Sequence, residues 1–145
     1  MFSSDGAKVL TTSLDGTAKL WSVASGICIQ TLDGHDVVMR LAVLSPDCGK
    51  VLTCSVDGTA KLWSIETGIC TQAFDGHRRA VRSAVLSPDG AEVLTASEDG
   101  TAKLWNAETG VCTHTFDGHL GGVMSAVFSP QPNCMVWSKA AHRKR

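Results

Sequence analysis

The chain has 145 residues, 13 of them basic and 14 acidic, and a net charge of −1. This balance gives no reason to expect nucleic acid or an anionic membrane as the main partner, and no apolar run approaches the roughly 20 residues that span a bilayer. The hydrophobic content of 43% argues against an intrinsically disordered chain.

A repeat with a period of 42 residues dominates the sequence. Residues 35–76 and 77–118 align without a gap and are identical at 27 of 42 positions. One Trp and one His recur with the same spacing, as Trp21, Trp63 and Trp105 and as His35, His77 and His119. Because self-similarity at a fixed period is the signature of repeat architectures, the sequence predicts a tandem array of one structural unit.

The first segment, residues 1–34, is an incomplete unit. Residues 2–6 match only the end of a first strand, and residues 7–34 then supply three further strands. This segment lacks a Gly-His pair of its own, whereas the following units begin with the His of such a pair. We therefore expect its innermost strand to be missing.

The two complete units, residues 35–76 and 77–118, are each divided by turn sequences into four short apolar stretches. In the second unit these turns read Ser87-Pro88-Asp89-Gly90, Asp99-Gly100 and Glu108-Thr109-Gly110. Pro and Gly suit their positions in such turns, and Asp-Gly between apolar runs is a strong hairpin signal. No stretch of about 10 residues carries a helical period, so each unit is predicted to be a meander of four antiparallel strands.

Residues 119–130 supply one surplus inner strand, with 123–129 as its apolar part. The repeat is then lost in a divergent tail, residues 131–145. In that tail Trp137 stands where the preceding unit has Thr95, and no Asp-Gly turn follows. The sequence therefore predicts strands for about three units.

The Gly-His pairs, the Ser-Pro-Asp turns and the Asp-Gly-Thr-Ala-Lys-Leu-Trp runs together resemble the WD-repeat β-propellers. The resemblance covers nearly all of the chain from residue 3 to about residue 130. One departure is that the family's Trp-Asp pair reads Trp21-Ser22, Trp63-Ser64 and Trp105-Asn106. The resemblance implies an all-β fold of β-propeller blades, each a four-stranded antiparallel meander. About three blades would leave the ring of a single chain incomplete.

A set of His, Ser and Asp recurs in each complete unit, and such a set can serve hydrolysis. Its repetition and the lack of a Gly-x-Ser-x-Gly elbow argue against catalysis, so we expect no enzymatic activity and no cofactor. The family resemblance implies a structural tetrad, in which Asp and Ser hydrogen-bond His and His connects to the Trp ring nitrogen. The tetrad positions are Ser13, Asp15 and Trp21, then His35, Ser55, Asp57 and Trp63, then His77, Ser97, Asp99 and Trp105, and finally His119.

The six cysteines do not suggest a disulfide framework or a metal site. Cys28, Cys70 and Cys112 are 42 residues apart, and no C-x-x-C pair is present, so we predict small core residues and no bound metal. The first six residues lack the basic start and apolar segment of a secretory signal. A cytoplasmic location is therefore expected, with access to the nucleus left open.

The positions that differ between units follow each Gly-His pair or precede the turn Asp. In the family they resemble the rim of the propeller face on which partners dock. They are Asp36, Met39, Arg40, Arg78, Arg79, Arg82, Glu98 and Met124. The four arginines would suit acidic or phosphorylated segments, and the alternative is that they are solvated charges.

The function expected from these features is a protein-binding scaffold or adaptor that presents a rigid face to proteins or peptides. Two alternatives stay open: a non-functional or partial fragment of a longer WD-repeat regulatory protein, and a nucleic-acid-associated propeller. Propellers usually close with four to eight blades. The surplus strand is what the first unit lacks, so a strand exchanged between two chains would close a six-blade ring as a homodimer. A truncated piece of a longer propeller is the competing explanation.

Overall fold

Every regular element of the described chain is a β-strand. The computed structural model describes residues 1–129, and these contain no helix long and apolar enough to cross a membrane. The strands in chain order are β1 (Lys8–Thr12), β2 (Thr17–Ser22), β3 (Cys28–Asp33), β4 (Met39–Leu44), β5 (Lys50–Ser55), β6 (Thr59–Ser64), β7 (Cys70–Asp75), β8 (Val81–Leu86), β9 (Glu92–Ser97), β10 (Thr101–Asn106) and β11 (Cys112–Asp117).

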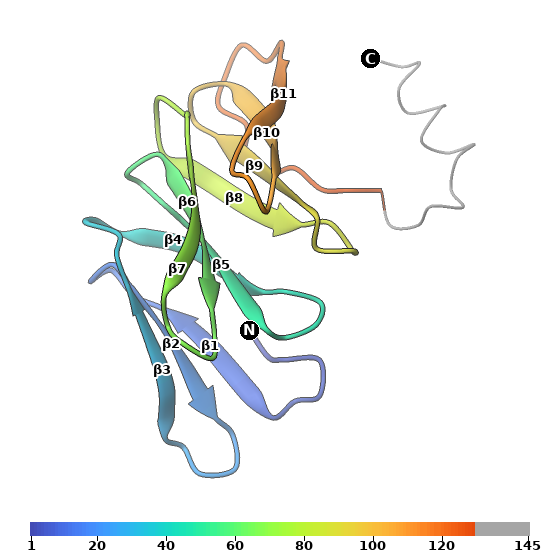
Figure 1. The fold of residues 1–145 in the computed structure, drawn as a ribbon. Coiled ribbons are helices and arrows are strands. Elements are labelled where there is room, and N and C mark those ends of the chain that lie inside the picture. The colour runs from blue at the N-terminus through green and yellow to red at the C-terminus, as the bar shows by residue number, and fades with distance from the viewer. Residues whose placement is uncertain (130–145) are drawn as a thin grey trace.

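The strands form three antiparallel sheets, β1–β3, β4–β7 and β8–β11, in which consecutive strands pair. Figure 1 shows the sheets side by side in chain order. The predicted fold class, all-β with about three blades of meandering strands, is confirmed. Within residues 1–129 the sheets do not close into a ring.

Tight Asp-Gly turns join the second and third strands of the four-stranded sheets. Gly58, between β5 and β6, has a φ of +86°, and a Cβ there would lie 3.2 Å from the carbonyl oxygen of His77. The position therefore needs glycine for its left-handed backbone and for the close approach of the next loop. Gly16 is equivalent, with a φ of +85° and a distance of 2.7 Å to the carbonyl oxygen of His35. Each hairpin turn thus contacts the histidine loop that opens the next sheet.

The hydrophobic core lies between adjacent sheets. Trp63 packs with Leu20 and Leu32 of the first sheet, and Trp105 packs with Phe74 of the second, at a ring-centroid distance of 5.8 Å. Burying a side chain of this size contributes about 1.5–3 kcal/mol to folding. Each of these tryptophans therefore fixes its own sheet on the sheet that precedes it in the chain.

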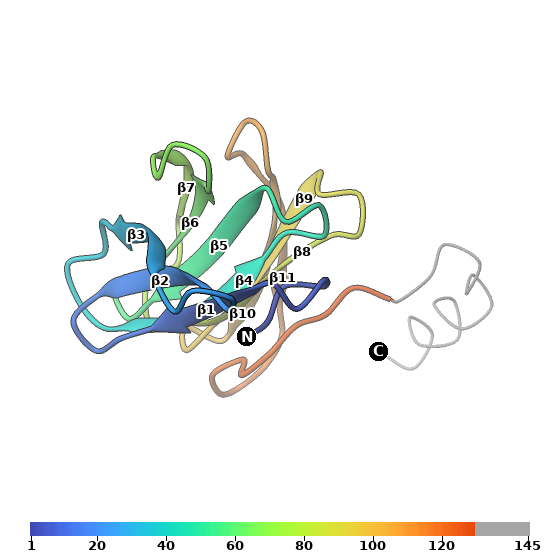
Figure 2. The same ribbon diagram turned by 90° about the horizontal axis from the view of Figure 1, so that it is seen from below.

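The two ends of the array differ from its middle. At the start, Phe2 forms an isolated bridge with Val9, so residues 1–3 cover only part of the free edge of β1. At the end, residues 118–129 form no strand in the single chain, so the surplus strand expected at 123–129 stays a prediction. The backbone N–H of Val123 instead donates to the carbonyl oxygen of Ser97 at 2.8 Å. Figure 2 shows this segment leaving the third sheet as a loop. The predicted tail, 131–145, lies outside the described residues.

Candidate functional site

A chain of hydrogen bonds crosses the second sheet from a carboxylate to an indole. His35 Nδ1–H donates to Asp57 Oδ2 at 2.9 Å, and the Thr53 hydroxyl donates to His35 Nε2 at 2.8 Å. Trp63 Nε1–H donates to Thr53 Oγ1 at 2.9 Å. These directions follow from chemistry, because the indole only donates and an ionised carboxylate only accepts. The carboxylate thus places a proton on His35 Nδ1, and Thr53 is the centre of the network.

The third sheet repeats this network with His77, Thr95, Asp99 and Trp105. The corresponding distances are 2.9 Å for His77–Asp99, 2.7 Å for His77–Thr95 and 2.9 Å for Trp105–Thr95. Burial opposes the ionisation of Asp99, but hydrogen bonds from the Thr101 hydroxyl, from His77 and from backbone N–H groups hold its pKa well below the ordinary value. Burial lowers the pKa of His77, and the nearby Asp99 carboxylate offsets part of that effect.

The hydrogen bonds predicted from Ser55 and Ser97 to the histidines are wrong. The Ser55 hydroxyl donates to the carbonyl oxygen of Val38 at 2.9 Å, and the Ser97 hydroxyl donates to that of Arg79 at 3.1 Å. The hydroxyl that reaches the histidine is two residues earlier in the same strand. A signal for it was present in the sequence, because a threonine recurs with the 42-residue period as Thr11, Thr53 and Thr95.

The first sheet contains only part of the network. Trp21 Nε1–H donates to Thr11 Oγ1 at 2.9 Å, and Asp15 Oδ1 accepts the Thr17 hydroxyl at 2.7 Å. Ser13 accepts the backbone N–H of Asp15 at 3.2 Å. None of the described histidines hydrogen-bonds to this group.

The remaining tetrad histidine, His119, is exposed after the last strand. Of the predicted tetrad residues, the structure therefore joins His, Asp and Trp in two sheets and leaves the set of the first sheet without a histidine. In the second and third sheets the network joins the histidine in the loop before the sheet to the Asp of the hairpin turn within it. This arrangement indicates a role in stabilising the fold.

The cysteines of the described residues lie outside this network. Burial raises the pKa of the Cys54 thiol to about 12, so the thiolate that would act as a nucleophile is suppressed. The cysteines of residues 1–129 are all free thiols, and no group of three or more His, Cys, Asp or Glu in that range could hold a metal ion.

The non-repeating positions form a second candidate site. We call it the rim and define it as Asp36, Arg40, Arg78, Arg79, Arg82, Glu98 and Met124. Arg82 Nη2 lies 2.6 Å from Glu98 Oε1, and Arg40 Nη2 lies 4.0 Å from the same oxygen. Since Arg40 belongs to β4 and Arg82 to β8, the rim spans two sheets. The prediction that Met39 faces a partner is wrong, because its side chain is 4% exposed and lies in the core.

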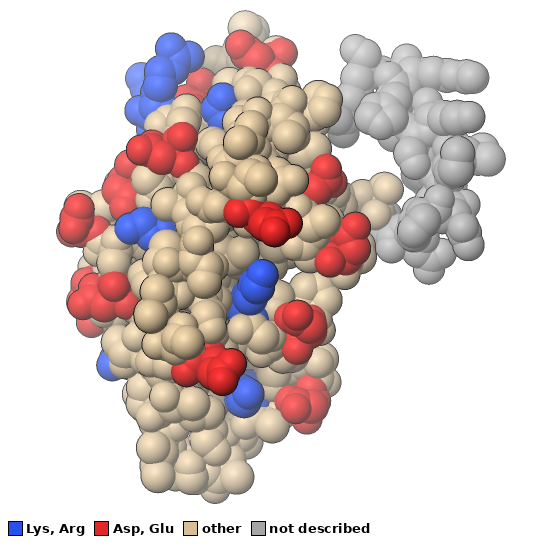
Figure 3. All heavy atoms as spheres, viewed as in Figure 1, with Lys and Arg blue, Asp and Glu red and all other residues tan. Residues whose placement is uncertain are grey.

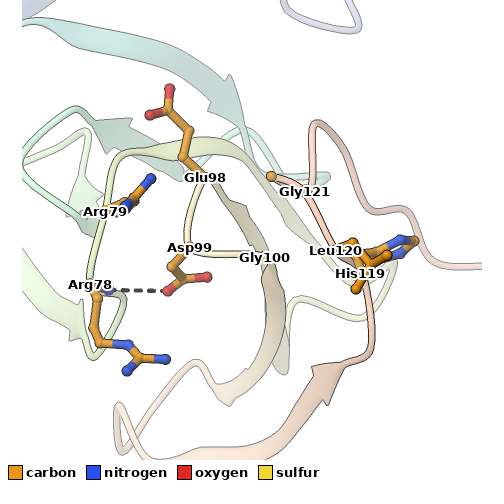
Figure 4. A pocket seen from close by; sticks show the side chains of 9 residues that line it. Arg78, Arg79, Glu98, Asp99, Gly100, His119, Leu120 and Gly121 are labelled. Carbon is orange, nitrogen blue, oxygen red and sulfur yellow. Dashed lines mark hydrogen bonds between the residues drawn. The ribbon is translucent and has the colours of Figure 1, made fainter.

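A pocket of about 480 Å³ lies beside the rim. It is lined by Arg78, Arg79 and Glu98 on one side and by the loop 119–122 on the other, as Figure 4 shows. The backbone N–H of Arg78 donates to Asp99 Oδ2 at 3.1 Å, which fixes this loop on the buried network. Charges of both signs are interspersed on the face seen in Figure 3, which shows no continuous basic surface.

Comparison with known proteins identifies the repeat. The family described as "WD domain, G-beta repeat" matches residues 1–22, 26–64, 68–106 and 110–138. The second and third of these segments each run from the last strand of one sheet to the third strand of the next, so the family's sequence repeat connects adjacent sheets. Proteins of this family generally mediate protein interactions as scaffolds and are typically not enzymes.

The human protein named "WD repeat-containing protein 86" is similar to part of the chain, with 54% identity over 39 residues. The match covers 27% of this chain and 10% of that protein, so the chain spans only a small part of the relative's length. The family segments, in contrast, extend over most of the chain. The chain belongs to the WD-repeat family.

Proposed function

We propose that this chain is a protein-binding scaffold whose specificity lies in the rim, and that the rim takes acidic or phosphorylated segments. The observation that carries the proposal is the convergence of Arg40 and Arg82, from two different sheets, on the single carboxylate of Glu98. An anionic group can replace that carboxylate, because a guanidinium binds carboxylate or phosphate through two parallel hydrogen bonds.

The distribution of repeated and non-repeated side chains supports this assignment. The repeated His, Thr and Trp side chains of the two complete networks are buried and bonded to one another, so they are not available to a partner. The non-repeated Arg78 and Arg79 are exposed beside the pocket, where they add positive charge next to Arg82. The near balance of 13 basic and 14 acidic residues favours a protein segment over a nucleic-acid backbone. Association with a second copy of this chain would use different surfaces, at the two ends of the array.

The test is binding of fluorescent peptides measured by anisotropy, with one Glu-rich peptide, one phosphoserine peptide and one uncharged peptide of equal length. We expect the Glu-rich and phosphoserine peptides to bind. Changing Arg40, Arg79 and Arg82 together to Ala should lower their affinity at least tenfold. Charge-assisted hydrogen bonds of this kind contribute about 1.5–3 kcal/mol each. Unchanged binding by the triple variant would remove the proposal.

Two further variants separate a specific rim from general charge attraction. Lys8→Ala with Lys50→Ala removes positive charge at the starts of β1 and β5, away from the rim, and is expected to leave binding unchanged. Glu98→Gln frees Arg82 and Arg40 from their carboxylate and is expected to tighten binding of both acidic peptides. Equal loss in the lysine control and in the arginine variant would point to non-specific attraction.

A further inference from the structure

We propose that two copies of this chain associate end to end, so that His119 and residues 123–126 of each copy complete the first sheet of the other. The result is a closed ring with six blades and two-fold symmetry. This inference concerns the ends of the array and is independent of what binds to the rim.

The same junction between neighbouring sheets occurs twice within the chain. A Cβ on Gly34 would lie 2.7 Å from the Trp63 ring, and one on Gly76 would lie 3.0 Å from the Trp105 ring. Each tryptophan therefore lies directly on the backbone before the histidine of its own sheet, where no larger side chain fits. A shift of 42 residues carries Gly34 to Gly76 and Gly76 to Gly118.

Both halves of a third such junction are uncovered in the single chain. Gly118 has no atom within 4 Å of where its Cβ would be, although its two counterparts contact a tryptophan. Phe116 is 49% exposed, whereas its equivalent Phe74 is 0% exposed beneath the Trp105 ring. At the other end of the array, Trp21 is only partly buried and belongs to no core cluster of the described residues. Trp21 of one copy and Gly118 of the other thus supply the two surfaces that meet in the internal junctions.

The hydrogen-bond network leads to the same pairing. The first sheet has Thr11, Asp15 and Trp21 but no histidine, and His119 is a histidine without this network. The backbone of His119 already lies against the Asp-Gly turn of the third sheet, with its carbonyl oxygen 3.5 Å from a Cβ on Gly100. The corresponding distance from His77 to Gly58 is 3.2 Å. The backbone of His119 therefore has the same position relative to the preceding hairpin turn as that of His77. In the dimer, Thr11 and Asp15 of the second copy would be the hydrogen-bond partners of the His119 ring.

The free edge of β1 accepts the strand that follows His119. In the complete sheets the backbone N–H groups of Val56 and Glu98 donate to the carbonyl oxygens of Val38 and Ala80. The equivalent residue in the first sheet, Leu14, is 81% exposed, and its N–H has no backbone acceptor among residues 1–129.

The register of the complete sheets places the incoming residues. Met39 pairs with Ser55 and Ala42 with Thr53, and a shift by the repeat places Val123 opposite Ser13 and Ala126 opposite Thr11. Met1 and Phe2 already cover Leu10 and Val9, which limits the exchanged strand to residues 123–126. Val123 is already turned inward in the single chain, as Met39 and Val81 are in theirs.

Two-fold symmetry satisfies both ends at once, because each copy donates one strand and accepts one. The six sheets of two copies fall within the four to eight blades with which propellers usually close. The exchanged strand also covers the free edge of β1 in each copy, which otherwise favours indefinite association.

The test is the mass of the 145-residue chain by size-exclusion chromatography with light scattering. We expect twice the chain mass of 15.3 kDa, without intermediate or larger species. Gly118→Val should give a folded monomer, because its side chain fills the space for the partner's Trp21 and meets nothing in the single chain. Gly34→Val is the matched control: it meets Trp63 within the same chain and should lower the thermal unfolding midpoint instead.

Trp21→Ala provides a second variant, because Trp21 is partly exposed and its removal should abolish the dimer while the circular dichroism spectrum stays that of a folded β-protein. A folded monomeric wild-type chain would overturn the proposal. A dimer that survives both Gly118→Val and Trp21→Ala would overturn it as well, since association would then use another surface. A trimer or an open series of sizes contradicts the two-copy ring.

Discussion

The first and second sheets carry the same Thr, Asp and Trp at the same spacing, yet only the second forms a closed network. Thr53 is 0% exposed and bonded to both His35 and Trp63, whereas the equivalent Thr11 is exposed and bonded to Trp21 alone. The difference between the sheets is the histidine loop and the inner strand that precede the second one.

This contrast shows that the network belongs to the junction between sheets rather than to one sheet. The loop that supplies His35 also covers the hairpin turn at Gly16 of the preceding sheet. A sheet without such a loop keeps its strands and turns, because these depend on local sequence, but its polar side chains stay accessible to water. The histidine therefore couples the stability of neighbouring sheets.

The largest effect expected from this contrast is that of removing the central hydroxyl. Thr53→Val keeps the shape of the side chain but leaves His35 Nε2 and the Trp63 indole N–H without partners in a buried place. The cost is about 1–3 kcal/mol for each buried group left unpaired. Thr11→Val should change stability by less than about 0.5 kcal/mol, because water can replace the hydroxyl.

Both substitutions are best made in the Gly118→Val background, so that association between copies does not contribute. Urea unfolding followed by tryptophan fluorescence gives the free energies of unfolding. Equal losses in the two variants would show that the histidine loop does not create the difference between the sheets.

A smaller effect is expected at the serine that the sequence placed in the network. Ser55→Ala removes the hydrogen bond to the carbonyl oxygen of Val38 and one acceptor of the Asp57 backbone N–H. It leaves the bonds of His35 intact, so the expected loss is about 1 kcal/mol. In the ¹⁵N NMR spectrum the side-chain signals of His35 and Trp63 should keep their shifts, whereas Thr53→Val should move both. A large change in these chemical shifts in Ser55→Ala would mean that Ser55 does belong to the hydrogen-bond network.

The strands and their connections were predictable from the sequence because the residues of each turn determine where one strand ends and the next begins. Asp57-Gly58 predicts the hairpin between β5 and β6, and Gly58 does adopt the left-handed backbone that such a turn requires. The fold class then followed from the repetition of these turns and from the resemblance to one family.

The parts that failed depend on contacts that local sequence does not specify. Thr53 and Ser55 lie on the same face of β5, because alternate residues of a strand share a face, and only the packed histidine loop decides which hydroxyl meets His35. Met39 turns into the core because the pairing of β4 with β5 shifts register between Met39 and Leu41, an irregularity that the sequence pattern does not reveal. Residues 123–129 form no strand in the single chain for a related reason, because a strand needs a hydrogen-bonding partner.

A further prediction compares the turns that precede the second strand of each blade. Cys48 has a φ of +58°, whereas Gly6 and Gly90 hold the equivalent positions with φ of +70° and +73°. Cys48→Gly should stabilise the chain by about 0.5–1 kcal/mol, because the left-handed conformation penalises a side chain by about 1–2 kcal/mol and the greater freedom of unfolded glycine offsets part of this gain.

The reverse change, Gly90→Cys, is the matched control. It should cost a similar amount, since a Cβ at Gly90 meets no atom within 4 Å and only the backbone is strained. Thermal unfolding of the three proteins gives the order of stability. Destabilisation by Cys48→Gly would mean that the thiol makes a contact worth more than the strain.

The smallest effect is the dependence of stability on mildly acidic pH. Burial lowers the pKa of His77 below its ordinary 6.5, although Asp99 partly offsets this, so the unfolded chain takes up the proton more readily than the folded one. The contribution of His77 is therefore fully present above pH 6.5 and is lost as the pH falls through its folded pKa. The first sheet has no histidine and contributes nothing in this range. Asp57 and Asp99, whose pKa values lie below the ordinary 3.8, add a further loss only when the pH falls below that value.

The effect of His77 stays small because the network can accept the extra proton. A protonated Nε2–H can donate to Thr95 Oγ1, and the Thr95 hydroxyl can then turn to the carbonyl oxygen of Lys103, 3.4 Å away. Urea unfolding between pH 5 and 7.5 should show stability falling toward acid, and His77→Asn should flatten the slope. His114→Gln is the control, because it gives an exposed histidine the residue that its sister sheets carry and should leave the slope unchanged. Stability that rises toward acid in the wild-type chain would mean that the Asp99 carboxylate, and not burial, dominates the titration of His77.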